Sequence, residues 1–259
     1  MVAAVAMVKD EADIIATTVG WMTRQVDLVI VADNRSTDGT RDILEALGSV
    51  QVIDDPEVGY YQSQKMTNLA RRAMEQGADW VVPFDADEMH LACNGMRLAD
   101  VLADVPDNVL VVEAPLFDHV ATGTDDQHLA DPVERLTWRR AAQAPLRKVA
   151  CRARPDLVIH QGNHSCHYDQ ERYVPHVSGV TEVRHFPYRS PEQMVRKAVN
   201  GGRAYQASNL PEHIGQHWRD YSRLVDQFGE KALHDVFHQW FYVKDPEQEQ
   251  GLVQDPCPK

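Results

Sequence analysis

Short apolar runs alternate with amphipathic stretches over the first 115 residues, a pattern typical of a parallel sheet covered by helices. The run over residues 26–32 is almost continuously apolar, as expected of a strand buried on both faces. Residues 63–76 carry apolar side chains at helical spacing and stop at Gly77. We therefore predict strands at residues 2–8, 26–32, 50–53, 80–84 and 109–113, helices at 40–47, 63–76 and 96–105, and a helix capped by Asp10.

The second half of the chain has a different pattern. Residues 118–145 are rich in Asp, His, Gly and Pro with weak periodicity, which predicts a long functional loop. Further strands are expected at residues 147–152, 157–160 and 180–186, and helices from Pro191 onward. We expect an α/β fold with a mostly parallel central sheet over residues 1–190, a helical extension over 191–244 and a loose tail over 245–259.

Composition narrows the possible partners. The chain has 259 residues, a formal net charge of −13 and four cysteines without CxxC spacing. The acidic balance argues against nucleic acid and anionic membranes, because no basic surplus exists to neutralise phosphates. The cysteine pattern fits a reducing compartment, and no segment is long and apolar enough for a leader or a membrane span. We expect a cytoplasmic protein without a transmembrane segment.

Three carboxylates follow the apolar strand at residues 80–84: Asp85, Asp87 and Glu88. Crowded carboxylates repel one another, and Mg²⁺ or Mn²⁺ relieves that repulsion while keeping positions open for a substrate phosphate. Asp33 ends the strand at 26–32, and the carboxyl ends of parallel strands share one edge, where ligands bind. The alternative is a polar turn after the strand, because Asp is common in turns.

Three segments in this order carry a family resemblance: residues 4–11 (AVAMVKDE), 29–40 (VIVADNRSTDGT) and 80–88 (WVVPFDADE). They resemble a family-2 glycosyltransferase of the GT-A fold. Asp33-Asn34 stands where the family has two acidic residues, and Ser63-Gln64-Lys65 replaces its Ala-Arg-Asn helix start. The resemblance implies a donor half at residues 1–115 and an acceptor and metal half at 116–190.

The resemblance also implies roles for single residues in binding a nucleotide-sugar donor and a metal. A narrower likeness covers residues 162–165 (GNHS) and 185–190 (HFPYRS). The implied metal is Mn²⁺ or Mg²⁺, held by Asp85, Asp87 and His185. The implied donor-binding residues are Val8, Glu11 and Asp33 near the base, Asp85 and Asp87 near the ribose and metal, Ala86 in the same turn, and Arg189 and Lys197 facing the diphosphate. Lys65, on the polar face of its helix, is a further candidate to assist the diphosphate.

Several side chains are candidates for the general base. Single-displacement inversion, usual in the family, requires a base to accept the acceptor hydroxyl proton. His164 is slightly favoured, and a structural histidine there is about as plausible. A structural zinc site around His164 and Cys166 is less favoured, because the segment lacks paired-ligand spacing. The other candidates for the base are Asp131, Glu134, Asp126 and Asp169.

The predicted function is transfer of a sugar from a nucleoside-diphosphate sugar to an acceptor hydroxyl. Inversion at the anomeric carbon is implied by the family resemblance alone. A UDP-sugar is the favoured donor, and a glycan or a small molecule is the expected acceptor. The sequence leaves open whether the protein forms a homo-oligomer. One alternative is a sugar-phosphate nucleotidyltransferase, which would need a glycine-rich basic loop where residues 9–13 (KDEAD) stand. The other is a non-catalytic nucleotide- or sugar-binding module of the same fold.

Overall fold

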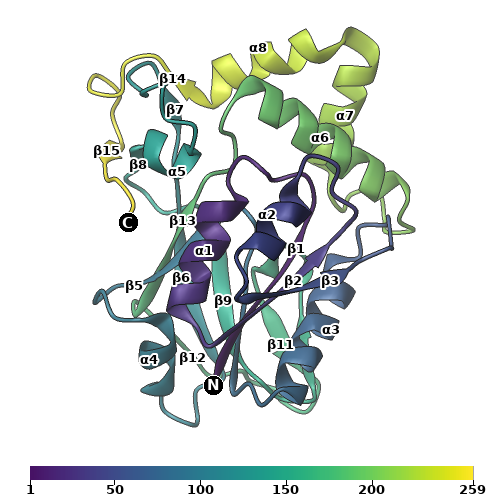
Figure 1. Cartoon of the computed structure of the whole chain (residues 1–259), viewed down its shortest axis with the longest axis vertical. Coiled ribbons are helices and arrows are strands. Elements are labelled where there is room, and N and C mark those ends of the chain that lie inside the picture. The colour runs from purple at the N-terminus through teal and green to yellow at the C-terminus, as the bar shows by residue number, and fades with distance from the viewer. Residues whose placement is uncertain (259) are drawn as a thin grey trace. The chain divides into compact units, whose positions relative to one another are not determined.

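The computed structural model describes residues 1–258, which divide into two compact units. The first unit comprises residues 1–54, 62–117 and 143–185 and contains the main sheet (Figure 1). The second comprises residues 55–61, 118–142 and 186–258. Each unit is described separately below.

The main sheet of the first unit has nine strands within the described residues. Its order is β3-β2-β1-β4-β9-β6-β13-β5, with β12 paired to β6. The strands are β1 (Val2–Val8), β2 (Leu28–Asp33), β3 (Val50–Asp54), β4 (Trp80–Pro83), β5 (Glu88–Ala92), β6 (Val111–Asp118), β9 (Arg147–Arg152), β12 (His176–Ser178) and β13 (Thr181–His185).

Strands β1 to β4 pair in parallel, so their carboxyl ends lie at one edge, as the sequence predicts. Val8 is in register with Asp33, and Val5 with Pro83. Beyond β4 the pairings of β9 with β4 and β6 are antiparallel, as is that of β13 with β5. The α/β fold class is confirmed, with parallel pairing concentrated in the first half of the sheet.

Helices α1 (Ile15–Gln25), α2 (Thr40–Ala46), α3 (Gln62–Glu75) and α4 (Leu98–Ala103) belong to the same unit. The apolar stripe of α3, including Met66 and Ala70, is buried in one cluster with Val5 and Val81 of the sheet. This cluster extends to the hairpin of β10 (Leu157–Ile159) and β11 (Cys166–Tyr168). Burying the stripe removes apolar surface from water at about 25 cal/mol per Å², which holds α3 against the sheet.

The predicted capping role of Asp10 is wrong. Helix α1 begins only at Ile15, and its first turn is capped by the backbone carbonyl of Glu11, which accepts from the amides of Ile14 and Ile15. Asp10 itself has φ 53°, and its Oδ1 accepts from the backbone N–H of Thr37 at 2.6 Å. Its carboxylate therefore stabilises the loop after β2 instead of the helix.

The second unit contains the helices predicted after Pro191: α6 (Pro191–Gln206), α7 (Gln216–Phe228) and α8 (Glu230–Trp240). The segment predicted as one long functional loop, residues 118–145, contains short elements: β7 (Ala121–Thr122), α5 (Pro132–Arg135) and β8 (Trp138–Arg140). The expected loose tail is partly wrong. Its residues Leu252–Gln254 form β15, which pairs with β8, and β14 (Tyr242–Val243) pairs with β7. Among the described residues, none of the helices combines the length and apolar character needed to cross a membrane.

Candidate active site

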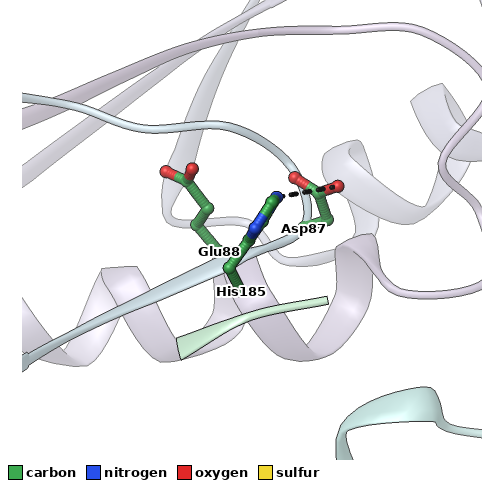
Figure 2. A group of neighbouring side chains, drawn as sticks. All are labelled: Asp87, Glu88 and His185. Carbon is green, nitrogen blue, oxygen red and sulfur yellow. Dashed lines mark ion pairs between the residues drawn. The ribbon is translucent and has the colours of Figure 1, made fainter. Parts of the chain in front are cut away.

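Asp87, Glu88 and His185 form the one group of candidate metal-ligating side chains found in residues 1–258. Each offers one ligand atom, and these atoms lie within 4.8 Å of one another. The chain leaves β4, turns through residues 84–87 and enters β5 at Glu88, which is in antiparallel register with His185 at the end of β13. Figure 2 shows the His185 imidazole between the two carboxyl groups.

Asp87 and His185 approach each other directly. His185 Nε2 lies 3.7 Å from Asp87 Oδ2, and the Asp87 residue is 2% exposed. Carboxylate oxygens with one imidazole nitrogen are a donor set that suits Mn²⁺ and accommodates Mg²⁺. The side chains present therefore fit a divalent cation of the kind that the sequence predicts.

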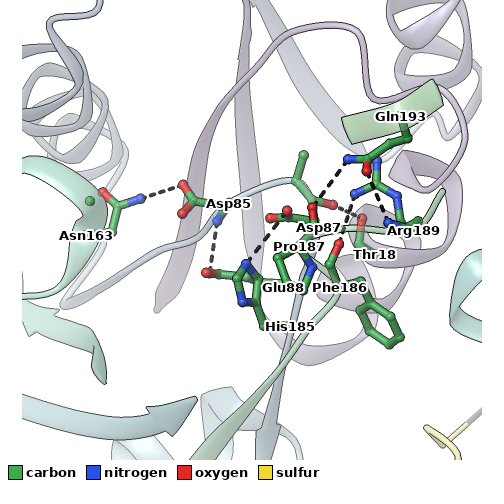
Figure 3. A network of polar contacts seen from close by, with 12 residues as sticks. Thr18, Asp85, Asp87, Glu88, Asn163, His185, Phe186, Pro187, Arg189 and Gln193 are labelled. Carbon is green, nitrogen blue, oxygen red and sulfur yellow. Dashed lines mark hydrogen bonds and ion pairs between the residues drawn. The ribbon is translucent and has the colours of Figure 1, made fainter. Parts of the chain in front are cut away.

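Asp85, the other aspartate of the motif, makes contacts of a different kind. Its Oδ2 lies 2.6 Å from Lys148 Nζ. Its Oδ1 accepts from the side-chain amide of Gln62 at 3.2 Å. It also accepts from the side-chain amide of Asn163 at 3.0 Å (Figure 3). Three separate segments thus fix one carboxylate, which points to a defined orientation for Asp85.

Lys148 is a site residue that the sequence reasoning missed. It lies on β9, is 2% exposed and places Nζ 2.8 Å from Glu88 Oε1. Nζ also donates to the backbone carbonyl of Gly162 at 2.9 Å. The available signal was a lysine inside a predicted strand, next to the apolar residues Val149, Ala150 and Cys151, because lysine is almost never fully buried unless it is paired.

The two buried partners shift each other's pKa in opposite directions. Burial alone would lower the pKa of Lys148, but attraction to Asp85 and Glu88 outweighs it and the pKa is raised. Burial alone would raise the pKa of Glu88, but the charge of Lys148 and a hydrogen bond from His90 outweigh it and the pKa is lowered. The ammonium and the Glu88 carboxylate are therefore both charged at neutral pH.

A short loop after β10 supplies the remaining contacts to this cluster. It contains the one-turn helix η1 (Gln161–Asn163). Gly162 has φ 80°, and its N–H donates to Gln62 Oε1 at 2.6 Å. Asn163 is fully buried with φ 59°, a left-handed conformation that asparagine tolerates better than most residues. The loop thus presents Asn163 to Asp85 and Gly162 to Lys148.

His164 follows directly in the same loop. Its Nδ1 lies 2.9 Å from the backbone carbonyl oxygen of Arg147, which requires Nδ1 to carry the proton. The neutral ring then has its lone pair on Nε2. Burial lowers the pKa of His164, and the positive charge of Lys148 lowers it further. His164 is therefore neutral at pH 7 and able to accept a proton at Nε2.

Residues predicted to bind the nucleotide base lie at the edge formed by β1 and β2. Asp33 is 4% exposed and accepts from the backbone N–H of Ser36 at 3.3 Å. The backbone carbonyl of Val8 accepts from the N–H of Asn34 at 2.8 Å, and the N–H of Glu11 donates to Thr40 Oγ1 at 2.8 Å. Ala86 is buried in the turn before Asp87, and Lys65 is half-buried on α3.

Four predicted site residues belong to the second unit. Asp131 accepts from the backbone N–H of Val133 at 2.9 Å and so caps α5, while Glu134 lies in the first turn of that helix. Arg189 is 2% exposed and donates to the backbone carbonyl of Phe186 at 3.0 Å. Lys197 is half-buried on α6. Their assigned roles stay predictions.

The other base candidates and the histidine-rich segment also have defined contacts. Asp126 accepts from the backbone N–H of His128 at 2.9 Å. Asp169 lies 3.2 Å from His167 Nε2, and His167 Nδ1 lies 2.6 Å from His160 Nε2. These contacts join His160, His167 and Asp169 in a chain that does not include His164.

Comparison with solved structures finds glycosyltransferases. Glucosyl-3-phosphoglycerate synthase from Mycobacterium tuberculosis, solved with phosphoglyceric acid, is 22% identical, with a TM-score of 0.33 over 45% of this chain. The match spans 44% of the mycobacterial chain. A mannosyltransferase from Pyrobaculum calidifontis, solved with GDP-Man and Mn²⁺, is 16% identical, with a TM-score of 0.45 over 92% of this chain and 74% of that chain.

Comparison at the level of sequence identifies the family. No curated protein sequence matches this chain significantly. The sequence profile of glycosyl transferase family 2 matches residues 5–154, which is more than half of the 259 residues. The matched region contains the end of β1, all of β2 and β4, the acidic turn at Asp85 and Asp87, and Lys148. The chain belongs to glycosyl transferase family 2.

Proposed function

We propose that this protein is a metal-dependent glycosyltransferase that transfers a sugar from a nucleoside-diphosphate sugar to an acceptor hydroxyl with inversion at the anomeric carbon. The observation that carries the proposal is the meeting of Asp87, Glu88 and His185 within 4.8 Å, after the carboxyl end of β4. Family membership supports the reaction class.

Asp87 and His185 would hold Mn²⁺ or Mg²⁺. When bound, the cation supplies positive charge that stabilises the diphosphate leaving group. Asp85 is fixed by Gln62, Lys148 and Asn163, and we assign it to the sugar and ribose hydroxyls of the donor, beside the cation. A carboxylate held on several sides loses little further freedom on binding, which favours affinity.

Donor recognition is proposed along the same sheet edge. Val8, Glu11 and Asp33 would contact the nucleotide base, Ala86 the ribose, and Lys65 the diphosphate. Uridine is the first base to test, with a glycan or a small molecule as acceptor.

His164 is proposed as the general base. Single displacement requires the acceptor oxygen to lose its proton as it attacks the anomeric carbon. The His164 ring is oriented by the Arg147 carbonyl at Nδ1, and its lowered pKa keeps Nε2 unprotonated. The proton would pass from the acceptor hydroxyl to Nε2, leaving an imidazolium stabilised by the hydrogen bond at Nδ1.

A thermal-shift screen tests the proposed function. The protein would be heated with UDP, GDP, ADP and CDP, each with Mn²⁺ and with EDTA. A ligand at a hundred times its Kd stabilises the folded state by about 2.7 kcal/mol, so the correct diphosphate should raise Tm by several degrees with Mn²⁺ alone. Equal Tm values in both conditions for all four diphosphates would contradict metal-dependent donor binding.

A further inference from the structure

Lys148 is the positive charge at the centre of the acidic turn. Its ammonium lies 2.6 Å from Asp85 Oδ2 and 2.8 Å from Glu88 Oε1. It comes from β9, on a different strand from both carboxylates. The ammonium therefore bridges two of the three acidic side chains that the turn presents.

Glu88 lies close enough to Asp87 and His185 to act as a third metal ligand. Its two oxygens have different contacts: Oε1 is buried and forms an ion pair with Lys148 Nζ at 2.8 Å but no hydrogen bond. Oε2 accepts from the backbone N–H of Asp85 at 3.1 Å and lies 3.4 Å from His90 Nε2. With 0% exposure, Glu88 cannot turn toward a cation without breaking these contacts.

The charges of the cluster also favour a single cation that Glu88 does not bind. When Asp85, Asp87 and Glu88 are all ionised they carry three negative charges, which is one more than a single divalent cation balances. Lys148 supplies one positive charge inside the cluster, where attraction between charges is stronger than in water. One divalent cation then balances the two negative charges that remain.

We propose that Lys148 is a positioning residue that stands in the place of a second cation. It holds Asp85 and Glu88 together, so that a single divalent cation binds through Asp87 and His185 and not through Glu88. This inference rests on the proposed metal-dependent function. A purely structural ion pair would stabilise the fold but would not determine how many cations bind.

The test counts bound Mn²⁺ in the full chain by electron paramagnetic resonance, in which free aqueous Mn²⁺ is detected and bound Mn²⁺ is not. We expect one Mn²⁺ per wild-type chain. Lys148→Gln should bind a second Mn²⁺, or one Mn²⁺ about tenfold more tightly, because it releases two carboxylates. Arg147→Gln is the matched control: it removes the same charge from the neighbouring residue, whose partner is Glu113 at 3.1 Å, and should behave as wild type.

Glu88→Gln tests the same inference without removing the buried ammonium. It keeps the shape of the side chain and the pair of Lys148 with Asp85. Because a residue beside the ligands also affects metal affinity, the comparison is with Asp87→Asn, the matched change at a proposed ligand, and Glu88→Gln should lose less Mn²⁺ affinity than Asp87→Asn. This variant decides the question if Lys148→Gln does not fold.

The outcomes separate the two proposals. A folded Lys148→Gln variant with wild-type stoichiometry and affinity, or a loss of Mn²⁺ affinity in Glu88→Gln as large as that in Asp87→Asn, would overturn the role of Lys148 alone. A wild-type chain that binds no Mn²⁺, with or without UDP or GDP, would overturn the metal-dependent function itself.

Discussion

His185 Nε2 lies 3.7 Å from Asp87 Oδ2, although the two residues are far apart in the sequence. Antiparallel pairing of β13 with β5 places His185 opposite Glu88, the residue that follows Asp87. This pairing therefore brings the His185 imidazole to the acidic turn that contains Asp87. This relationship leads to the first two predictions.

Replacing His185 should weaken metal binding without abolishing the fold. His185→Ala removes one nitrogen donor, and we expect the apparent affinity for Mn²⁺ to fall about tenfold or more, since a carboxylate site with one ligand fewer holds the cation less tightly. Mn²⁺ titration followed by electron paramagnetic resonance measures the change. His176→Ala, at an exposed histidine of β12, is the control. If the Mn²⁺ titration of His185→Ala matches that of the wild type, His185 has a structural role and is not a metal ligand.

Replacing Asp87 should remove the dependence of diphosphate binding on metal. We expect wild-type protein to bind a nucleoside diphosphate at least about tenfold more tightly with Mn²⁺ than with EDTA, because a cation held by Asp87 and His185 would supply positive charge to the diphosphate. Asp87→Ala should bind equally in both conditions. Calorimetry makes the comparison, with Asp42→Ala at the exposed start of α2 as control. A metal effect that persists in Asp87→Ala would contradict the assignment.

Replacing His164 should lower turnover more than donor affinity. His164→Gln removes the proposed base, and general-base catalysis contributes about 10²- to 10⁴-fold. Because burial and Lys148 lower the pKa of His164 below 6.5, the wild-type base stays neutral as the pH falls through 6.5. The pH profile of kcat/KM should thus turn downward only below that value. A profile that already falls above pH 7, or a variant that loses affinity alone, would count against this role.

Glu88 should make the free energy of unfolding depend on pH in the acidic range. Its pKa is lowered in the folded state, so its contribution is complete above the unfolded value of about 4.5 and is lost as the pH falls toward the folded pKa. Glu88→Gln should be less stable at pH 7 by about 1–3 kcal/mol, and by less at pH 4. Urea unfolding at both pH values measures this, with the exposed Glu75→Gln as control. An equal difference at the two pH values would refute the linkage.

Asn163 offers a separate test of the loop that reaches Asp85. Both Asn163→Gly and Asn163→Ala lose the 3.0 Å hydrogen bond to Asp85. Only alanine is also strained at φ 59°, so it should be less stable than glycine by about 1 kcal/mol. Thermal unfolding of the two variants makes the comparison. Equal Tm values would show that the loop relaxes to a different backbone conformation.

Strongly periodic and continuously apolar segments were predictable from the sequence. The strands at residues 2–8 and 147–152 have the observed bounds, and α3 is displaced by one residue at each end. These segments owe their structure to burial of their own side chains, which the local pattern records. The acidic turn was also predictable, because it follows such a strand directly.

Features that depend on distant partners were not predictable. Asp10 has the residue type of a helix cap, but tertiary contact with Thr37 determines its conformation. Strand β5 was missed because it begins with Glu88 and is stabilised by pairing with β13. Lys148 has no local motif, and its role depends on two carboxylates brought to it by the order of strands in the sheet.

The most direct test of the central claim is a crystal of the protein soaked with Mn²⁺ and UDP or GDP, whichever the thermal screen selects, with diffraction recorded at the manganese absorption edge. We predict one anomalous peak per chain, about 2.1–2.3 Å from both Asp87 and His185 and in contact with the diphosphate. A bound diphosphate without an anomalous peak at these two residues would contradict the account.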